Sequence, residues 1–180
     1  MVIINPADDV EARAAVLAMA EYDGPAYLRF GRLAVPRINP IDYNFELGKG
    51  IQLCEGNDVT IIATGLMVAE ALAAKETLAN EGINARVINI HTIKPLDRDI
   101  VIAAAKETGA IVTAEEHNII GGLGSAVAEV VCEACPVPVL RVGVEDKFGA
   151  SGPAVEMLKI YGLTAEHIVE KAKAAIQAKK

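Results

Sequence analysis

The feature that most constrains this chain is a regular alternation of apolar runs and helical stretches that begins near residue 58. Short apolar runs are typical of buried strands, and in this part of the chain they cover residues 58–64, 85–90, 110–114 and 138–144. The stretches between and after these runs predict helices over about 66–81, 95–107, 123–134 and 165–178. Strands that alternate with helices predict an α/β domain with a parallel-dominated sheet, covered by helices on both faces.

The first part of the chain holds a separate, smaller pattern. It predicts a strand at residues 2–4, a helix over about 9–21 with Asp8 as its N-cap, and a second strand at 26–30. A strand–helix–strand unit of this size is too small to be stable alone, so it must dock on something else. Residues 34–50 then show no sustained period and contain two prolines, which predicts a linker or a long crossover.

Composition and charge argue against several classes of protein. The net charge of −7 and the absence of Trp argue against a nucleic-acid-binding surface. No apolar run approaches the roughly 20 residues that a membrane helix needs. Because the sequence also opens without a basic or signal-like segment, we expect a cytoplasmic location.

The stretch AEEHNIIGGLGSAVAEVV, residues 114–131, places glycines directly before a helix, an arrangement that often holds a phosphate. A dinucleotide fingerprint would have Gly or Ala where Val127 stands, and it would follow its strand without the intervening residues 115–120. Two glutamates in that interval would repel a pyrophosphate, although an acidic pair at 145–146 stands near the place of a ribose-binding acid. We therefore expect the glycines to let the helix start close against the sheet and to hold no phosphate.

The cysteines give weak evidence for a redox or metal site. Cys132 and Cys135 form a C-x-x-C pair, but zinc needs further ligands and Cys54 stands alone. We expect the pair to be two small residues that pack at the end of a helix.

The titratable residues leave one cluster to explain. His91, His117 and His167 do not stand at metal-ligand spacing. The sequence Glu115–Glu116–His117 follows a predicted strand and could do acid–base chemistry, or it could form a hydrogen-bonded loop or an interface. The second interpretation is favoured, because titratable loops are often structural.

Four segments carry a family resemblance: GPAYLRFGR, LGKGIQLCEGNDVTIIATG, ARVINIHTIKPLD and AEEHNIIGGLGSAVAEVV. Together they resemble the C-terminal portion of transketolases, especially the form encoded as two separate subunits. IKPLD and the EEH-glycine element are shared with related thiamine diphosphate enzymes, the β subunits of 2-oxoacid dehydrogenases and deoxyxylulose-phosphate synthase. The resemblance implies a Rossmann-like three-layer α/β sandwich with a parallel-dominated mixed sheet. It also implies a transferase that moves a two-carbon ketol unit between sugar phosphates, as in the pentose phosphate pathway.

The resemblance implies a division of the chain. Residues 1–33 would be a remnant of the pyrimidine-binding domain, 34–47 a linker, and 48–180 the transketolase C-terminal domain, which is structural and supports dimers. The family's cofactor-activating glutamate and ring pocket would lie upstream, and its metal-binding G-D-G segment would lie on an N-terminal partner subunit. Thiamine diphosphate and magnesium are then expected in the complete enzyme, with no cofactor or metal on this chain alone, which would be inactive. The expected assembly contains the N-terminal subunit and a homodimer.

The resemblance assigns one binding residue. Arg32 matches the family's arginine that contacts the substrate phosphate, because a guanidinium pairs bidentately with phosphate oxygens. Arg29 is the weaker candidate, and Arg32 could equally be a surface arginine paired with a carboxylate. Two other functions stay open. One is the C-terminal domain of a 2-oxoacid dehydrogenase β subunit, and the other is a stand-alone dinucleotide-binding module.

Overall fold

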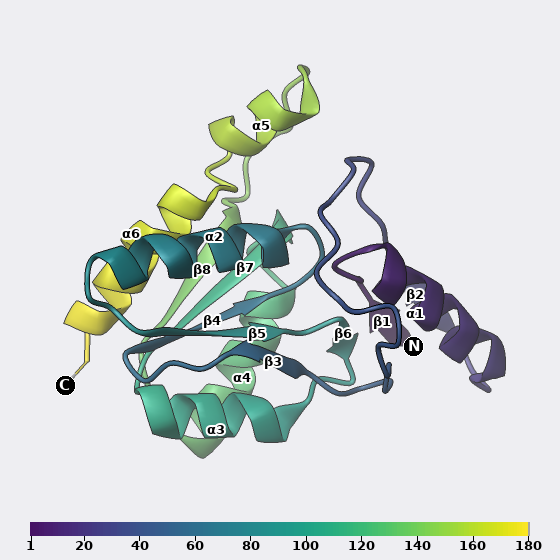
Figure 1. Ribbon diagram of the computed structural model, residues 1–180, viewed down its shortest axis with the longest axis horizontal. Helices are drawn as coiled ribbons and strands as arrows, with labels where there is room; N and C mark the ends of the chain where they lie inside the picture. The colour runs from purple at the N-terminus through teal and green to yellow at the C-terminus, as the bar shows by residue number, and fades with distance from the viewer. Residues whose placement is uncertain (180) are drawn as a thin grey trace.

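The computed structural model describes residues 1–179 and contains two sheets (Figure 1). The main sheet has five strands in the order β3-β5-β4-β7-β8. Strands β4, β5, β7 and β8 run parallel, and β3 joins the edge antiparallel to β5. The strands are β3 (Ile51–Cys54), β4 (Val59–Ala63), β5 (Ala85–Asn89), β7 (Ile111–Asn118) and β8 (Val139–Val144). The sheet is therefore mixed and mostly parallel, as expected.

Helices cover both faces of this sheet. Val59 and Ile61 of β4 pack with α2 (Met67–Asn80) and α6 (Ala165–Gln177) on one face. Their neighbour Ile62 packs with α3 (Arg98–Thr108) and α4 (Leu123–Ala134) on the other. All three side chains are fully buried, and burial of an aliphatic side chain of this size contributes about 1.5–3 kcal/mol. This arrangement confirms the three-layer α/β sandwich.

The N-terminal unit forms the second, smaller sheet. It contains β1 (Val2–Ile4), α1 (Asp9–Glu21) and β2 (Ala26–Leu28), and its strand order is β2-β1-β6. The third strand, β6 (Thr92–Lys94), comes from the chain directly after β5 and pairs antiparallel with β1. The unit thus docks on the main domain by sharing a sheet with it.

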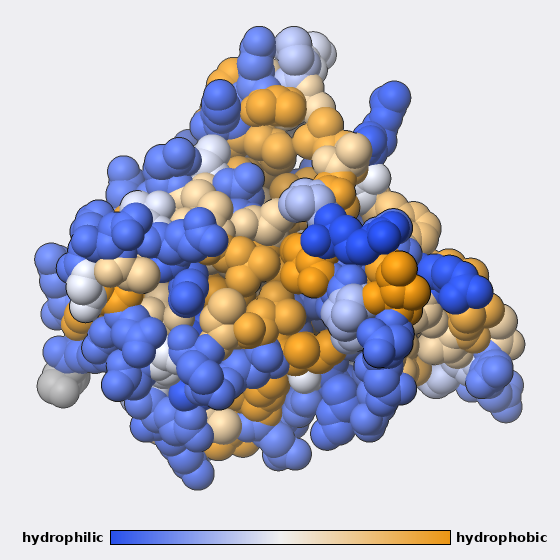
Figure 2. All heavy atoms as spheres, viewed as in Figure 1, coloured by the Kyte–Doolittle hydropathy of each residue, from blue (hydrophilic) through white to orange (hydrophobic). Residues whose placement is uncertain are grey.

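Helix α5 (Ala154–Ile160) stands apart from these layers. It projects from the body (Figure 1), and none of its residues is buried. Phe148, in the loop before it, is fully exposed, and Figure 2 shows hydrophobic surface at this projecting end. No helix within residues 1–179 combines the length and apolar character needed to cross a bilayer.

The structure corrects three expectations about individual elements. Strands β3 and β6 were not expected, because each falls in a stretch without a clear alternating pattern. Strand β7 continues to Asn118, so residues 115–117 belong to a strand and not to a loop.

Residues 29–50 contain no helix or strand. The division at 33 and 47 stays a prediction.

Two carboxylates of the α1 region hold the segment that follows β2. Asp8 accepts a hydrogen bond from the backbone N–H of Glu11, which caps the helix, and others from Ile38 and Asn39 at 2.8 and 2.6 Å. Burial works to raise the pKa of Asp8, but these backbone donors together outweigh it and lower the pKa. Asp9 pairs with Arg37, further along the same segment. Residues that look like a linker in the sequence are therefore fixed to the N-terminal unit.

Candidate functional site

A cleft of about 630 Å³ lies where the N-terminal unit meets the carboxyl ends of β7 and β8. One wall is the segment after β2, the second is the end of β7, and the third is the α5 region. Ligands of open α/β sheets commonly bind beyond the carboxyl ends of the strands. The polar side chains that line the cleft belong to Arg29, Arg32, Glu116, His117, Asn118 and Tyr161.

The two arginines of this segment have different environments. Arg29 is half-buried, and its guanidinium donates a hydrogen bond to the backbone carbonyl of Glu116, which ties the segment to the end of β7. Arg32 is exposed and lines the cleft. Within residues 1–179 its guanidinium has no hydrogen-bond or ion-pair partner. Arg29 thus ties the segment to β7, whereas the Arg32 guanidinium is uncommitted within residues 1–179.

In the glycine loop beside this cleft, the N-terminus of α4 binds the carboxylate of a residue of the same chain, Glu115. Glu115 is 1% exposed, and its carboxylate accepts hydrogen bonds from the backbone N–H groups of Leu123 and Gly124, both at 2.8 Å. A carboxylate at this place satisfies the free N–H groups and the positive end of the helix dipole. A Cβ on Gly122 would lie 2.0 Å from the Glu115 carboxylate, so the glycine is needed for this close approach. The loop therefore starts the helix against the sheet and leaves no place for a phosphate at its first turn.

The end of β7 reaches this geometry through an irregular register with β8. Ala114 pairs with Val142 and Asn118 pairs with Val144, so residues 115–117 lie opposite Gly143 alone. A Cβ on Gly143 would lie 2.8 Å from the backbone carbonyl of His117. The glycine therefore permits the bulge that turns Glu115 toward α4.

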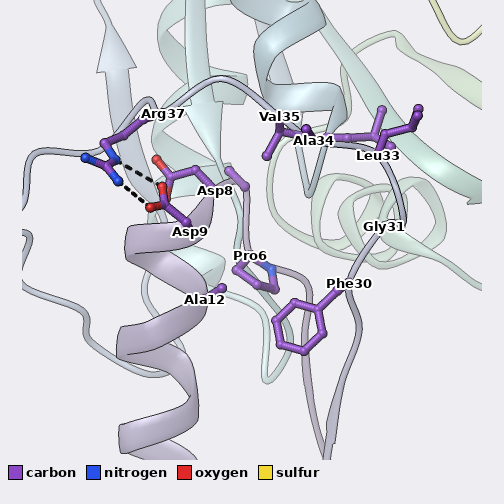
Figure 3. Close-up of a pocket in the computed structure, with 12 residues that line it drawn as sticks. Pro6, Asp8, Asp9, Ala12, Phe30, Gly31, Leu33, Ala34, Val35 and Arg37 are labelled. Carbon is purple, nitrogen blue, oxygen red and sulfur yellow. Dashed lines mark hydrogen bonds and ion pairs between the residues drawn. The ribbon is translucent and has the colours of Figure 1, made fainter. Parts of the chain in front are cut away.

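A second cavity of about 540 Å³ adjoins the first and shares Phe30, Gly31 and Leu33 with it. Figure 3 shows its lining, with Pro6 and Phe30 near one another and the pair formed by Asp9 and Arg37 at the start of α1. Arg37 donates to Asp9 at 3.0 and 2.5 Å, and this hydrogen-bonded pairing lowers the pKa of Asp9. Because its guanidinium is already paired, this cavity offers an anion less than the Arg32 cleft does.

The remaining candidates from the sequence lie elsewhere. His91 is fully buried against the Phe45 ring, with 4.3 Å between ring centroids, and burial lowers its pKa to about 4. His167 on α6 contacts Glu170 at 3.2 Å. Cys135 packs against the α3–α4 core, whereas Cys132 is exposed. Among the residues described, no group of three or more His, Cys, Asp or Glu side chains is arranged to hold a metal ion.

The sequence profile of the transketolase C-terminal domain matches residues 48–168. The chain belongs to the transketolase family. Enzymes of this family generally depend on thiamine diphosphate. The match begins just before β3 and covers the main sheet and most of its helices, so the family resemblance seen in the sequence is confirmed.

Relatives of this transketolase-family chain include proteins that are named as transketolase subunits. The 6-deoxy-6-sulfo-D-fructose transketolase subunit of Clostridium sp. is 50% identical over 96% of this chain and 53% of its own length. One of the subunits of the apulose-4-phosphate transketolase of Phocaeicola vulgatus is 42% identical over 96% of this chain and 55% of its own length. The chain thus spans about half the length of these curated relatives.

A solved structure shares this transketolase fold closely. It is described as split gene transketolase, inactive beta4 tetramer, and it matches with a TM-score of 0.95 and 48% identity over 100% of this chain and 58% of that chain. The agreement extends over the N-terminal unit as well as the main domain.

In this transketolase-family chain the glycine loop, where the sequence suggested a possible phosphate site, does not fit a pyrophosphate. The N-terminus of α4 is held by the carboxylate of Glu115, which would repel a phosphate and already occupies the backbone donors. No step of cofactor chemistry is therefore assigned to the glycine loop.

Proposed function

We propose that this chain is the C-terminal portion of a split-subunit transketolase that moves a two-carbon ketol unit between sugar phosphates, and that Arg32 binds the terminal phosphate of the sugar. The observation that carries the proposal is the state of Arg32. It lines a cleft at the carboxyl ends of the strands without a protein partner among residues 1–179, while Arg29 beside it is tied to Glu116. An exposed, uncommitted guanidinium is suited to bidentate contact with a phosphate.

The proposed assembly contains more than this chain. An N-terminal transketolase subunit would complete the active site, two copies of each subunit would associate, and thiamine diphosphate with magnesium would supply the electron sink for the carbanion. This chain would be inactive by itself. The relatives support such an assembly, since two of them are named as transketolase subunits.

The relatives differ in the anionic group of the sugar that their names specify, so they do not decide which group this chain would bind. The names of two relatives specify a sulfonated sugar and a phosphorylated sugar. Both groups are tetrahedral anions with oxygens that a guanidinium can pair with. We propose the phosphate, because it carries the larger charge and gains more from Arg32.

The test uses the complete enzyme, formed by this chain, the upstream pyrimidine-domain segment and the N-terminal subunit. Arg32→Ala should raise the KM for a phosphorylated acceptor about 10–100-fold, since a hydrogen bond to a charged group contributes about 1.5–3 kcal/mol. Arg13→Ala is the matched control, because Arg13 is also an exposed arginine but lies on α1. Steady-state kinetics with a phosphorylated, a sulfonated and an uncharged acceptor measures the effect. An equal loss for all three acceptors would show that Arg32 does not bind the terminal anion.

A further inference from the structure

We infer that the C-terminal domain forms part of the substrate site, and that the His117 imidazole is a second ligand of the terminal anion, in the cleft that Arg32 also lines. This inference rests on the proposed function and assigns to the domain a role beyond structural support.

Half of the polar side chains that line the cleft are already committed to partners in the protein. Arg29 donates to the Glu116 carbonyl, and Tyr161 donates its hydroxyl to the carbonyl of Phe148 at 2.9 Å. The Asn118 amide donates to Asp146 at 3.0 Å and accepts from the backbone N–H of Ile120 at 2.8 Å. Of the six polar residues in the lining, the structure of residues 1–179 leaves Arg32, Glu116 and His117 with uncommitted side chains.

The backbone around His117 is fixed although its side chain is exposed. Glu115, two residues before it in the strand, is anchored to the N-terminus of α4, and the Glu116 carbonyl is held by Arg29. Asn118, directly after it, is anchored to Asp146. Because the backbone is already anchored, only the rotation of the His117 side chain is lost when a ligand binds. The imidazole has no hydrogen-bond or ion-pair partner within residues 1–179 and is free to contact a ligand.

The two free donors complement each other. A guanidinium can occupy two oxygens of a phosphate, and an imidazole N–H can donate to a third. Arg32 comes from the N-terminal unit and His117 from the end of β7, so a sugar phosphate would bridge the two parts of the chain. Arg29 and His117 also border a smaller cavity of about 140 Å³ beside the glycine loop, so both residues line two neighbouring spaces.

Glu116 is the third side chain of the cleft that is uncommitted among the described residues. Its carboxylate lies 3.5 Å from the Cβ position of Gly31, the residue before Arg32. A carboxylate repels a phosphate but accepts hydrogen bonds from sugar hydroxyls. Glu116 is therefore suited to the polyol part of a sugar phosphate and not to its anion.

The main experiment is a double-mutant cycle in the complete enzyme with a phosphorylated acceptor. His117→Ala should lower kcat/KM about 5–20-fold and Arg32→Ala about 10–100-fold, and the double variant should lose clearly less than the product of the two. His117→Gln, which keeps an N–H donor, should recover part of the loss. His167→Ala is the control, since His167 lies on α6 and faces Glu170. The loss for an unphosphorylated acceptor should be at least about fivefold smaller than for the phosphorylated one.

Equal losses for both acceptors, or fully multiplicative effects in the double variant, would overturn the inference. A second measurement is independent of activity: the NMR signals of the His117 imidazole in this chain should shift on titration with inorganic phosphate, and not with chloride at equal ionic strength. Absence of that shift would also overturn it. If the assembled enzyme transfers no ketol unit while phosphate still shifts His117 in wild type and not in Arg32→Ala, the anion site stands and the transketolase proposal falls.

Discussion

At the scale of single residues, a carboxylate of the protein takes the place that an anion would have in the glycine loop. Glu115 supplies the negative charge that the N-terminus of α4 attracts, and Gly122 leaves the space for it. The sequence shows both residues, and the charge of Glu115 argues against a pyrophosphate there. What it does not show is that a carboxylate eight residues before Leu123 folds back onto the helix. That contact depends on the path of β7, which is set by pairing with β8.

The capping role of Glu115 gives a prediction for stability. Glu115→Ala should lower the free energy of unfolding by about 1–3 kcal/mol, because two buried backbone N–H groups lose their partner. Urea denaturation followed by circular dichroism measures this. Glu129→Ala on the exposed face of α4 is the control and should change stability by no more than about 0.5 kcal/mol. An equal effect of the two substitutions would mean that the Glu115 contacts are not important for stability.

The elements differ in how far the sequence predicts them. The long, buried strands and the capped helices follow from apolar runs and N-cap residues, and α1, α4 and α6 begin where expected. Strands β3 and β6 have only four and three residues and contribute one antiparallel edge each, so they lack a local signal. The polar end of β7 has no apolar pattern either, and for that reason the sequence predicts a loop there. Tertiary pairing, and not propensity, makes it a strand.

The bulge at the end of β7 predicts a specific sensitivity in β8. Gly143→Ala should destabilise the protein by about 1–3 kcal/mol, because its Cβ would lie 2.8 Å from the His117 carbonyl, which cannot move as a side chain does. Thermal unfolding measures the loss. Gly149→Ala provides a control in the loop after β8, where an added Cβ meets nothing within 4 Å. A Gly143→Ala protein as stable as wild type would show that the bulge can relax.

At the scale of the whole molecule, a buried polar cluster joins the N-terminal unit to the main domain. Glu11 of α1 is fully buried and accepts hydrogen bonds from Tyr43 and Asn89, both at 2.9 Å. Burial raises the pKa of Glu11, despite these donors. His91 lies at the same junction, and its carbonyl accepts from the backbone N–H of Asn5 at 2.8 Å. The sequence shows each of these residues but not their meeting, since they come from segments that are far apart.

The buried state of His91 predicts a loss of stability in acid. Its pKa is lowered from 6.5 to about 4 in the folded protein, so between these values the unfolded chain binds a proton that the folded protein does not. This contribution is fully present above pH 6.5 and is lost as the pH falls toward 4, by up to about 3 kcal/mol. Urea unfolding of wild type and His91→Gln across this range measures it.

Comparing wild type with His91→Gln separates the effect of His91 on the pH dependence of stability from the effects of its titratable neighbours. Glu11, with its raised pKa, changes stability in the opposite direction over acidic pH, and Asp8, with its lowered pKa, in the same direction. Both residues are present in each protein, so they cancel in the difference. The difference in unfolding free energy should therefore shrink as the pH falls from 7 to 4.5. A constant difference would contradict the assignment.

The strand order β2-β1-β6 shows that the two parts of the molecule exchange an element: a strand from the main-domain part of the chain lies in the sheet of the N-terminal unit. Strand β6 follows β5 in the chain, yet it completes the sheet of the N-terminal unit. A gene split or recombined near residue 48 would therefore yield a C-terminal product in which β6 presents an open sheet edge, and unpaired edges promote aggregation. A viable break must fall further upstream and carry β1 along, which limits how such a protein can be divided and exchanged as a module.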